Sequence, residues 1–120
     1  MVSQEKPHRL AWLLNKLYPY KFIRVDDYEI DINSKPCSFS QFIFEDEENH
    51  TQLIMLANKD DSSFLIPELK NFDYLILVKG AIDYFEGELL KSNIKTIPSI
   101  QIIFQVETNS IKSKQNLIYV

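Results

Sequence analysis

The chain has 120 residues, of which 17 are acidic and 13 basic, so its formal net charge at pH 7 is −4. This length suits one domain with one core, and a composition of 45% apolar and 25% charged residues is globular, which excludes a disordered chain. Two glycines are too few for the Gly-rich phosphate loops of many nucleotide enzymes, and the acidic balance argues against a general nucleic-acid binder.

Cysteine content and apolar runs predict the compartment. The single cysteine, Cys37, cannot form an internal disulfide, so the fold does not depend on an oxidising environment. The first nine residues lack the apolar core of a secretory leader, and no apolar run approaches the ~20 residues of a membrane-spanning helix. We therefore expect a soluble, cytoplasmic protein that does not contact a membrane.

The first predicted element is an amphipathic helix that Pro7 starts and that Pro19 ends after Tyr18. Trp12 lies off its apolar stripe, so the indole either packs under a second surface or stays exposed as an anchor for a partner. The stripe has the spacing i, i+3, i+4 and i+7 and consists of Leu10, Leu13, Leu14 and Leu17.

From Tyr20 the apolar residues recur at every second position, which predicts β-strands with one solvent-facing side. The first of these strands carries Tyr28, Ile30 and Ile32 between acidic residues. The Ser-Lys-Pro sequence at 34–36 is expected to break it.

Two apolar segments, residues 38–44 and 51–57, flank the acidic stretch 45–50 and predict a β-hairpin with an acidic turn. The second segment is apolar on both faces. We therefore expect it to be a central strand of the sheet, covered by helices.

The second half of the chain predicts a strand at 73–79 that Gly80 closes, then a helix at 82–94 that Gly87 weakens, then a last strand. No conformation is predicted for residues 109–120. The helix is expected to pack through Ile82, Phe85, Leu89, Leu90 and Ile94. The last strand is expected to bury Ile100, Ile102, Phe104 and Val106.

Strands bracketed by helices are typical of an α+β fold. We expect a mostly antiparallel sheet of about five strands, with an N-terminal helix and a second helix before the last strand. No linker is long enough to divide the chain, so residues 1–120 are predicted to form a single domain.

One motif stands out at residues 66–74, which read I-P-E-L-K-N-F-D-Y. This segment resembles the IPExxxVDY family, small bacterial proteins named after the motif, and the resemblance implies no assigned activity. Phe72 stands where the family name has valine. The matching residues are Ile66, Pro67, Glu68, Asp73 and Tyr74.

Each motif residue also has a structural explanation. Pro67 can start a helical turn, Glu68 can accept hydrogen bonds in that turn, and Asp73 can cap the turn before the next strand. Tyr74 can bury its ring while its hydroxyl finds a partner. The motif is therefore either part of the architecture or a binding surface centred on Glu68 and Asp73.

Catalytic and metal-binding patterns are missing from the sequence. His8, Cys37 and His50 are far apart and lack the paired spacing of zinc ligands. The acidic stretches do not have the spacing of a calcium loop, and there is no G-x-S-x-G nucleophile elbow. We expect neither an enzyme nor a bound metal or cofactor.

The charges are strongly segregated along the chain. Residues 1–25 carry +4 and residues 26–61 carry −8, so an acidic hairpin could steer the protein towards a basic partner. The basic residues near the N-terminus could instead contact RNA; they are Arg9, Lys16, Lys21 and Arg24. The candidate interaction surface consists of Glu45, Asp46, Glu47, Glu48, Glu68, Asp73 and Trp12.

The sequence thus favours a non-enzymatic cytoplasmic protein that acts through protein–protein interaction or self-association. Two alternatives stay open. One is an accessory protein of RNA metabolism that binds RNA or an RNA-processing enzyme. The other is a regulator that responds to a small molecule or a metal.

Overall fold

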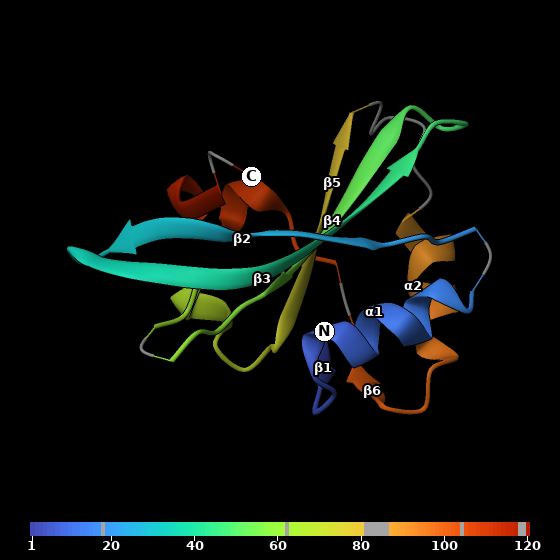
Figure 1. The fold of residues 1–120 in the computed structure, drawn as a ribbon, viewed down its shortest axis with the longest axis horizontal. Coiled ribbons are helices and arrows are strands. Elements are labelled where there is room, and N and C mark those ends of the chain that lie inside the picture. Colours follow the sequence, from blue (N-terminus) through green and yellow to red (C-terminus); the bar gives the residue numbers. More distant parts are fainter. Residues whose placement is uncertain (18, 62, 81–86, 104, 118–119) are drawn as a thin grey trace.

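A computed structural model describes residues 1–17, 19–61, 63–80, 87–103, 105–117 and 120. The chain has the predicted α+β fold, with one helix near the N-terminus and a second before the last strand (Figure 1). The elements are, in order, β1 (Val2–Ser3), α1 (Pro7–Asn15), β2 (Ile23–Ile32), β3 (Lys35–Asp46), β4 (Thr51–Ala57), η1 (Pro67–Leu69), β5 (Tyr74–Gly80), α2 (Gly87–Lys95), β6 (Ile100–Ile102), η3 (Thr108–Ser110) and η4 (Lys114–Leu117).

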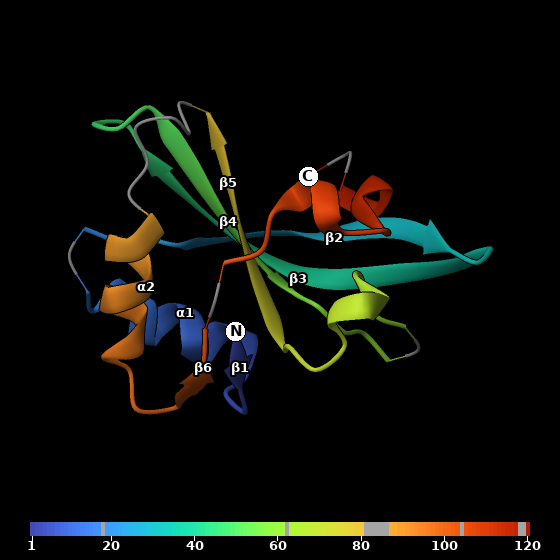
Figure 2. The same ribbon diagram turned by 180° about the vertical axis from the view of Figure 1, so that it is seen from behind.

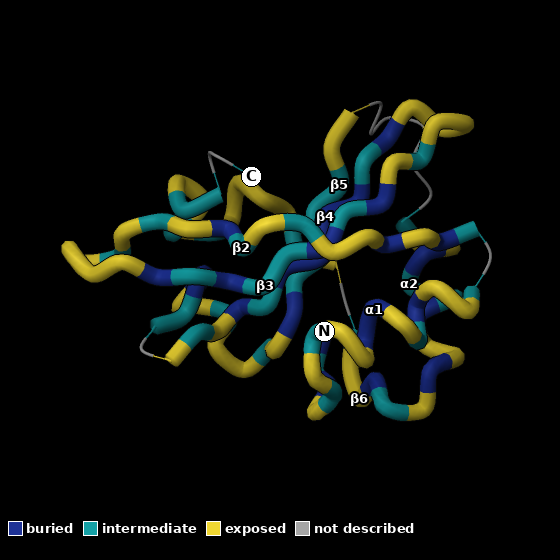
Figure 3. The backbone as a smooth tube through the Cα atoms, in the orientation of Figure 1, coloured by how far each residue is buried: buried dark blue, intermediate teal, exposed yellow. Residues whose placement is uncertain are grey.

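The strands form two antiparallel sheets. The larger sheet is a meander in the order β2-β3-β4-β5, and the smaller one pairs β1 with β6. Consecutive strands of the meander are neighbours, and short turns join β2 to β3 and β3 to β4, whereas residues 58–73 connect β4 to β5. The tips of the β2–β3 and β3–β4 hairpins are exposed at opposite ends of the molecule (Figure 3).

Strand β4 is central and buried on both sides, as its apolar pattern predicts. Leu53 and Met55 belong to one hydrophobic cluster, whereas Ile54 and Leu56 belong to the other. The first cluster is covered by α1, α2 and the small sheet, which lie on one side of the larger sheet (Figures 1 and 2). The second cluster is covered by the segment around η1 and by the C-terminal segment, so helices α1 and α2 cover only one face.

The expected break at residues 34–36 is wrong, because Lys35 and Pro36 already belong to β3. The turn consists of Asn33 and Ser34 alone, whose φ angles are 53° and 65°. Positive φ at both positions is typical of a two-residue hairpin turn. Pro36 is tolerated because β3 pairs there with β2 only, and β4 joins its other side from Gln41 onward.

Helix α1 packs through the predicted stripe but ends at Asn15, and Tyr18 lies outside the described residues. Leu10 and Leu14 are fully buried. The side chain of Asn15, the last residue of α1, binds the backbone of Phe22 just before β2. Its Oδ1 accepts the N–H of Phe22 at 2.6 Å, and its Nδ2 donates to the carbonyl of Phe22 at 2.9 Å.

Two expectations for the second half are wrong. In α2, Leu90 and Ile94 are buried, but Leu89 is 54% exposed. Strand β6 ends at Ile102, which is 52% exposed, while Ile103 packs against the first cluster. The alternation fails there because β6 has only the two-residue β1 as a partner. Ile82, Phe85 and Phe104 lie outside the described residues.

After β6 the chain passes from one face of the larger sheet to the other. Ile103 packs against the first cluster, whereas Ile111 packs against the second. Between them the chain crosses the outer edge of β5, as both views show (Figures 1 and 2). The C-terminal segment thereby reaches the face that α1 and α2 leave open.

Gly80 is required by the end of the β4–β5 pair. Its φ is 102°, and a Cβ atom there would clash with the carbonyl oxygen of His50. We expect Gly80→Ala to lower the free energy of unfolding by about 2 kcal/mol or more, because backbone strain and the clash add.

Gly87→Ala is the matched control. A Cβ atom at Gly87 would meet only the side-chain Oε1 of Gln105, at 3.1 Å, and that side chain can move. The free energy of unfolding should change by less than ~1 kcal/mol. Urea denaturation of both variants checks this, and equal losses would contradict the account of Gly80.

Candidate functional site

The side chain of Asn58 is a buried polar group that organises the motif segment. Asn58 follows β4 directly and is fully buried. Its Nδ2 donates to the carbonyls of Leu69 at 2.9 Å and Phe72 at 3.2 Å, and its Oδ1 accepts the N–H of Ile66 at 2.8 Å. The single side-chain amide of Asn58 therefore forms hydrogen bonds with backbone groups that would otherwise lack partners.

The backbone of Asn58 continues the same bracing. Its N–H donates to the carbonyl of Asp73 at 2.9 Å, and its carbonyl accepts the N–H of Leu65 at 2.8 Å. Asn58 thus holds both ends of the segment that carries the motif, although it lies outside the motif itself.

Glu68 connects the motif to the C-terminal segment. Its side chain is exposed, and Oε2 accepts the backbone N–H of Ser113 at 2.7 Å. Hydrogen bonding from Ser113 lowers the pKa of the Glu68 carboxyl below its usual range.

The first two residues of the motif have structural roles. Ile66 is fully buried in the second cluster, and Pro67 starts η1 as expected.

Asp73 and Tyr74 bind the N-terminus. The carbonyl of Met1 accepts the N–H groups of Asp73 at 2.8 Å and Tyr74 at 3.1 Å, and the amino group of Met1 donates to the carbonyl of Tyr74 at 2.7 Å. The carboxylate of Asp73 accepts the N–H of Ser3 at 2.9 Å, and the hydroxyl of Tyr74 donates to the carbonyl of Glu5. Both carboxylates of the motif are therefore engaged within the molecule.

Burial shifts two titrations at this junction. Burial lowers the pKa of the Met1 amino group from 8.0 to about 6, although the negative charge of Asp73 opposes the shift. Burial also raises the pKa of the Tyr74 hydroxyl to about 12, and the charges of Asp73 and Glu5 add to that effect.

The acidic turn lies at the tip of the β3–β4 hairpin. Asp46 accepts hydrogen bonds from the backbone and side chain of Asn49, at 3.2 Å and 2.8 Å, and Glu45 accepts from the side chain of Gln52 at 2.5 Å. Glu47 and Glu48 are exposed, and neither carboxylate pairs with another described residue. The turn is therefore a solvated acidic tip with two free carboxylates.

Trp12 is exposed and lies between two cations. The Cζ atom of Arg9 is 4.3 Å and the Nζ atom of Lys16 is 3.6 Å from the centre of the indole ring, which is the geometry of cation–π contacts. Trp12 is 46% exposed. Arg9 also pairs with Glu5 at 3.4 Å. We call Arg9, Trp12 and Lys16 the α1 face.

The other two basic residues of the predicted set do not join the α1 face through any contact of the described residues. Arg24 forms an ion pair with Asp27 and lies 5.4 Å from the centre of the Phe42 ring. Lys21 is exposed after α1. The set is therefore divided, with only Arg9 and Lys16 held at the indole.

The residues of the predicted interaction surface lie in three separate places. The acidic tip, α1 and η1 are well apart in both views (Figures 1 and 2). The structure does not bring Trp12 to Glu47 or to Glu68. Sequence reasoning missed the α1 face as a unit, although the spacing of 9, 12 and 16 places all three residues on one side of a helix.

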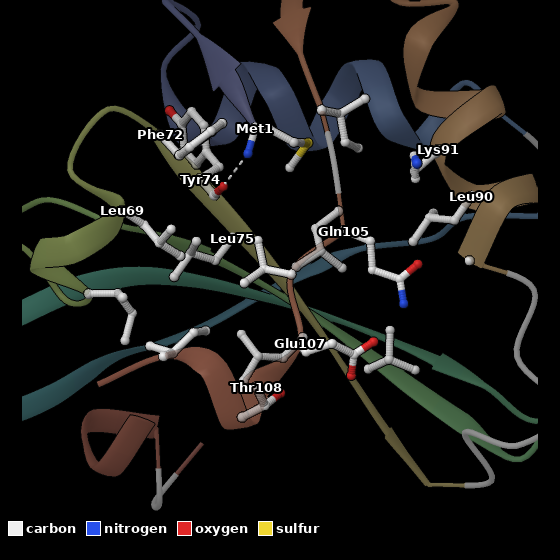
Figure 4. Close-up of a pocket in the computed structure, with 18 of the residues that line it drawn as sticks. Met1, Leu69, Phe72, Tyr74, Leu75, Leu90, Lys91, Gln105, Glu107 and Thr108 are labelled. Carbon is white, nitrogen blue, oxygen red and sulfur yellow. Dashed lines mark hydrogen bonds between the residues drawn. The ribbon is translucent and has the colours of Figure 1, made fainter. Parts of the chain in front are cut away.

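A cavity of about 420 Å³ lies beside β5, and its walls are mostly apolar (Figure 4). It is lined by consecutive residues of β5 from Tyr74 to Val78, by Met1 at the Tyr74 end, and by Leu90 and Ile103 from the layer of α2. Sequence patterns did not predict this cavity, because its walls come from segments that are distant in the chain.

Neither a cluster of metal ligands nor a membrane-spanning helix is found among the residues that the structure describes. Within the residues that the structure describes, no three or more His, Cys, Asp or Glu side chains gather as metal ligands would. Cys37 is buried, while His8 and His50 are exposed. None of the described helices is both long enough and apolar enough to span a membrane.

No family model, curated protein or solved structure matches this chain. The resemblance of residues 66–74 to the IPExxxVDY family stays a prediction from the motif.

Asn58→Leu should lower the free energy of unfolding by about 3 kcal/mol, because several buried backbone groups lose their partner while the volume changes little. Urea denaturation measures the effect. Asn109→Leu, at an exposed position, is the control and should stay within ~0.5 kcal/mol of the parent. A loss at Asn58 no larger than that would show that the amide does not brace the segment.

The amino group of Met1 should make stability depend on pH. The pKa of this group is about 6 in the folded chain, whereas an unburied amino terminus, as in the unfolded chain, has a pKa of 8.0. Between pH 6 and pH 8 the unfolded chain therefore binds more protons than the folded chain. The free energy of unfolding should therefore rise by on the order of 2 kcal/mol from ~pH 5 to ~pH 9.

Acetylation of the Met1 amino group is the control for this pH dependence. The acetylated chain has no group that titrates at this position, so its urea midpoint should rise less with pH. Equal slopes for the acetylated and free chains would refute the assignment to Met1.

Proposed function

We propose that this chain is a non-enzymatic cytoplasmic protein that binds an acidic segment of a partner protein through the α1 face. The observation that carries the proposal is the exposed indole of Trp12 between Arg9 and Lys16. The buried free thiol of Cys37 suits a reducing compartment.

An exposed tryptophan beside two cations has the chemistry of an interaction hot spot. Tryptophan and arginine are enriched among the residues that dominate binding energies. The indole supplies apolar contact area, and the cations supply charge-assisted hydrogen bonds to carboxylates. A partner segment that combines acidic residues with an apolar one would satisfy both.

Helix α1 holds this face rigidly. Leu10 and Leu14 on its other side are fully buried in the first cluster, and Asn15 ties its C-terminus to Phe22. A rigid face loses little conformational entropy on binding. The partner should be acidic, because the N-terminal 25 residues carry a net charge of +4.

RNA is a second candidate that one observation favours. Bases stack on exposed aromatic rings, and cations beside the ring can contact phosphates. Against it, Glu5 already pairs with Arg9, Arg24 pairs with Asp27, and the whole chain is acidic. A protein partner therefore fits the charge distribution better.

The test uses Trp12 as its own reporter, because it is the only tryptophan in the chain. The probe is a synthetic peptide that alternates glutamate with leucine, compared with its glutamine counterpart. We expect the acidic peptide to change the Trp12 fluorescence saturably. Lys16→Glu should weaken binding at least ~10-fold, which is the size of a hot-spot loss.

Trp12→Ala, with binding followed by calorimetry, should cause a similar loss. The matched control is Leu89→Ala, since Leu89 is also an exposed apolar side chain but lies on α2. It should leave the affinity unchanged.

Three outcomes would contradict the proposal. Equal binding of the glutamine peptide would remove the role of charge. Tighter binding of single-stranded RNA that weakens steeply with salt would favour the RNA reading. A dimer that dissociates on reversing the charges of Glu47 and Glu48 would show self-association through the acidic tip.

A further inference from the structure

Strand β5 is the last strand of the larger sheet. Among the described strands it pairs with β4 alone, in the order β2-β3-β4-β5. The bond from the Asn58 N–H to the Asp73 carbonyl lies on the β4 side, so the next residue, Tyr74, directs its N–H and carbonyl to the outer side. Met1 binds both of these groups of Tyr74.

The same alternation leaves Ile76 and Val78 without partners on the outer side. Backbone groups of an antiparallel strand point to the same side at every second residue, so these two also direct their N–H and carbonyl groups outward. Across the described ranges, neither residue has a backbone partner there, although both are half-buried. Unpaired N–H and carbonyl groups along the edge of a sheet can pair with the backbone of another strand, so this edge is suited to a further strand.

The cavity of about 420 Å³ runs along this open edge. Every residue from Tyr74 to Val78 lines it, and it extends to apolar side chains on both faces, such as Leu69 on one face and Leu90 on the other. The segment that carries Gln105 and Glu107 also lines the cavity (Figure 4). A volume of this size is within the ~300–1,000 Å³ usual for ligand sites.

Met1 sets the direction and register of any added strand. The reciprocal bonds between Met1 and Tyr74 are those of an antiparallel pair. A strand that continues this pairing along β5 would run antiparallel to it and end opposite Leu75, next to the amino group of Met1. The only other charged side chains at the cavity, within the described residues, are Lys91 and Glu107, whose formal charges cancel.

We propose that the cavity binds the C-terminal end of an extended apolar peptide, which pairs antiparallel with Ile76 and Val78 and places its free carboxylate at the amino group of Met1. The unpaired backbone groups specify a peptide rather than a hydrocarbon chain, because a hydrocarbon leaves them without partners. This site is separate from the α1 face.

The probe is the tetrapeptide acetyl-Val-Thr-Val-Leu with a free carboxylate, compared with the same peptide amidated at its C-terminus. We expect amide NMR shifts centred on Ile76 and Val78, and slower hydrogen exchange of these two amides in the complex. At pH 5.5, where an amino group with a pKa of about 6 is largely protonated, the amidated peptide should bind at least ~10-fold more weakly, because it loses the charge-assisted bond to Met1.

A fusion provides the decisive control. Val-Thr-Val-Leu attached directly before Met1 would occupy the same edge within the chain, so it should protect the amides of Ile76 and Val78 and abolish peptide binding. Trp12→Ala should bind the tetrapeptide as the parent does, which separates this site from the proposed function.

Three results would overturn the proposal. The first is an absence of shifts at Ile76 and Val78 at millimolar peptide. The second is equal affinity for the free and amidated peptides. The third is binding of decanoate at the cavity as tight as that of the tetrapeptide, without protection of the two amides, which would assign the cavity to a hydrocarbon ligand.

Discussion

The buried amide of Asn58 is the interaction on which the arrangement of the N-terminal half depends. It closes the segment between β4 and β5, and that segment delivers Asp73 and Tyr74 to the backbone of Met1. The five residues from Met1 to Glu5, held by Tyr74 and Asp73, lead directly into α1. The place of α1 on the sheet therefore depends on a polar group that lies directly after β4.

The two proposed surfaces have different origins. The α1 face follows from local helical spacing, because residues three and four positions apart lie on one side of a helix. The edge of β5 follows from topology, because β5 is the last strand of the meander and no other described strand pairs along its outer side. One surface presents charge and an indole, and the other presents backbone groups within an apolar cavity.

Sequence patterns predicted the elements whose surroundings are uniform along their length. The stripe of α1 and the two-sided apolar pattern of β4 are examples, because each faces a continuous core. The patterns failed where the surroundings change within an element. Ile102 is exposed because β6 has a two-residue partner, and Pro36 is accepted in β3 because β4 does not reach it.

The contacts that define the candidate sites were harder to predict. The motif drew attention to Glu68 and Asp73, but the residue that braces the segment is Asn58, which the motif does not include. The pairing of Met1 with Tyr74 joins residues 73 positions apart, which no periodicity encodes. The α1 face was also missed, although the spacing of Arg9, Trp12 and Lys16 would have been sufficient to predict it.

Trp12 presents an exposed indole flanked by two cations, and collisional quenching of its fluorescence measures this arrangement in solution. Iodide should quench Trp12 more strongly than caesium, because Arg9 and Lys16 attract the anion and repel the cation. Lys16→Glu should reduce or reverse that difference. Equal quenching by iodide and caesium in the parent chain would contradict the account.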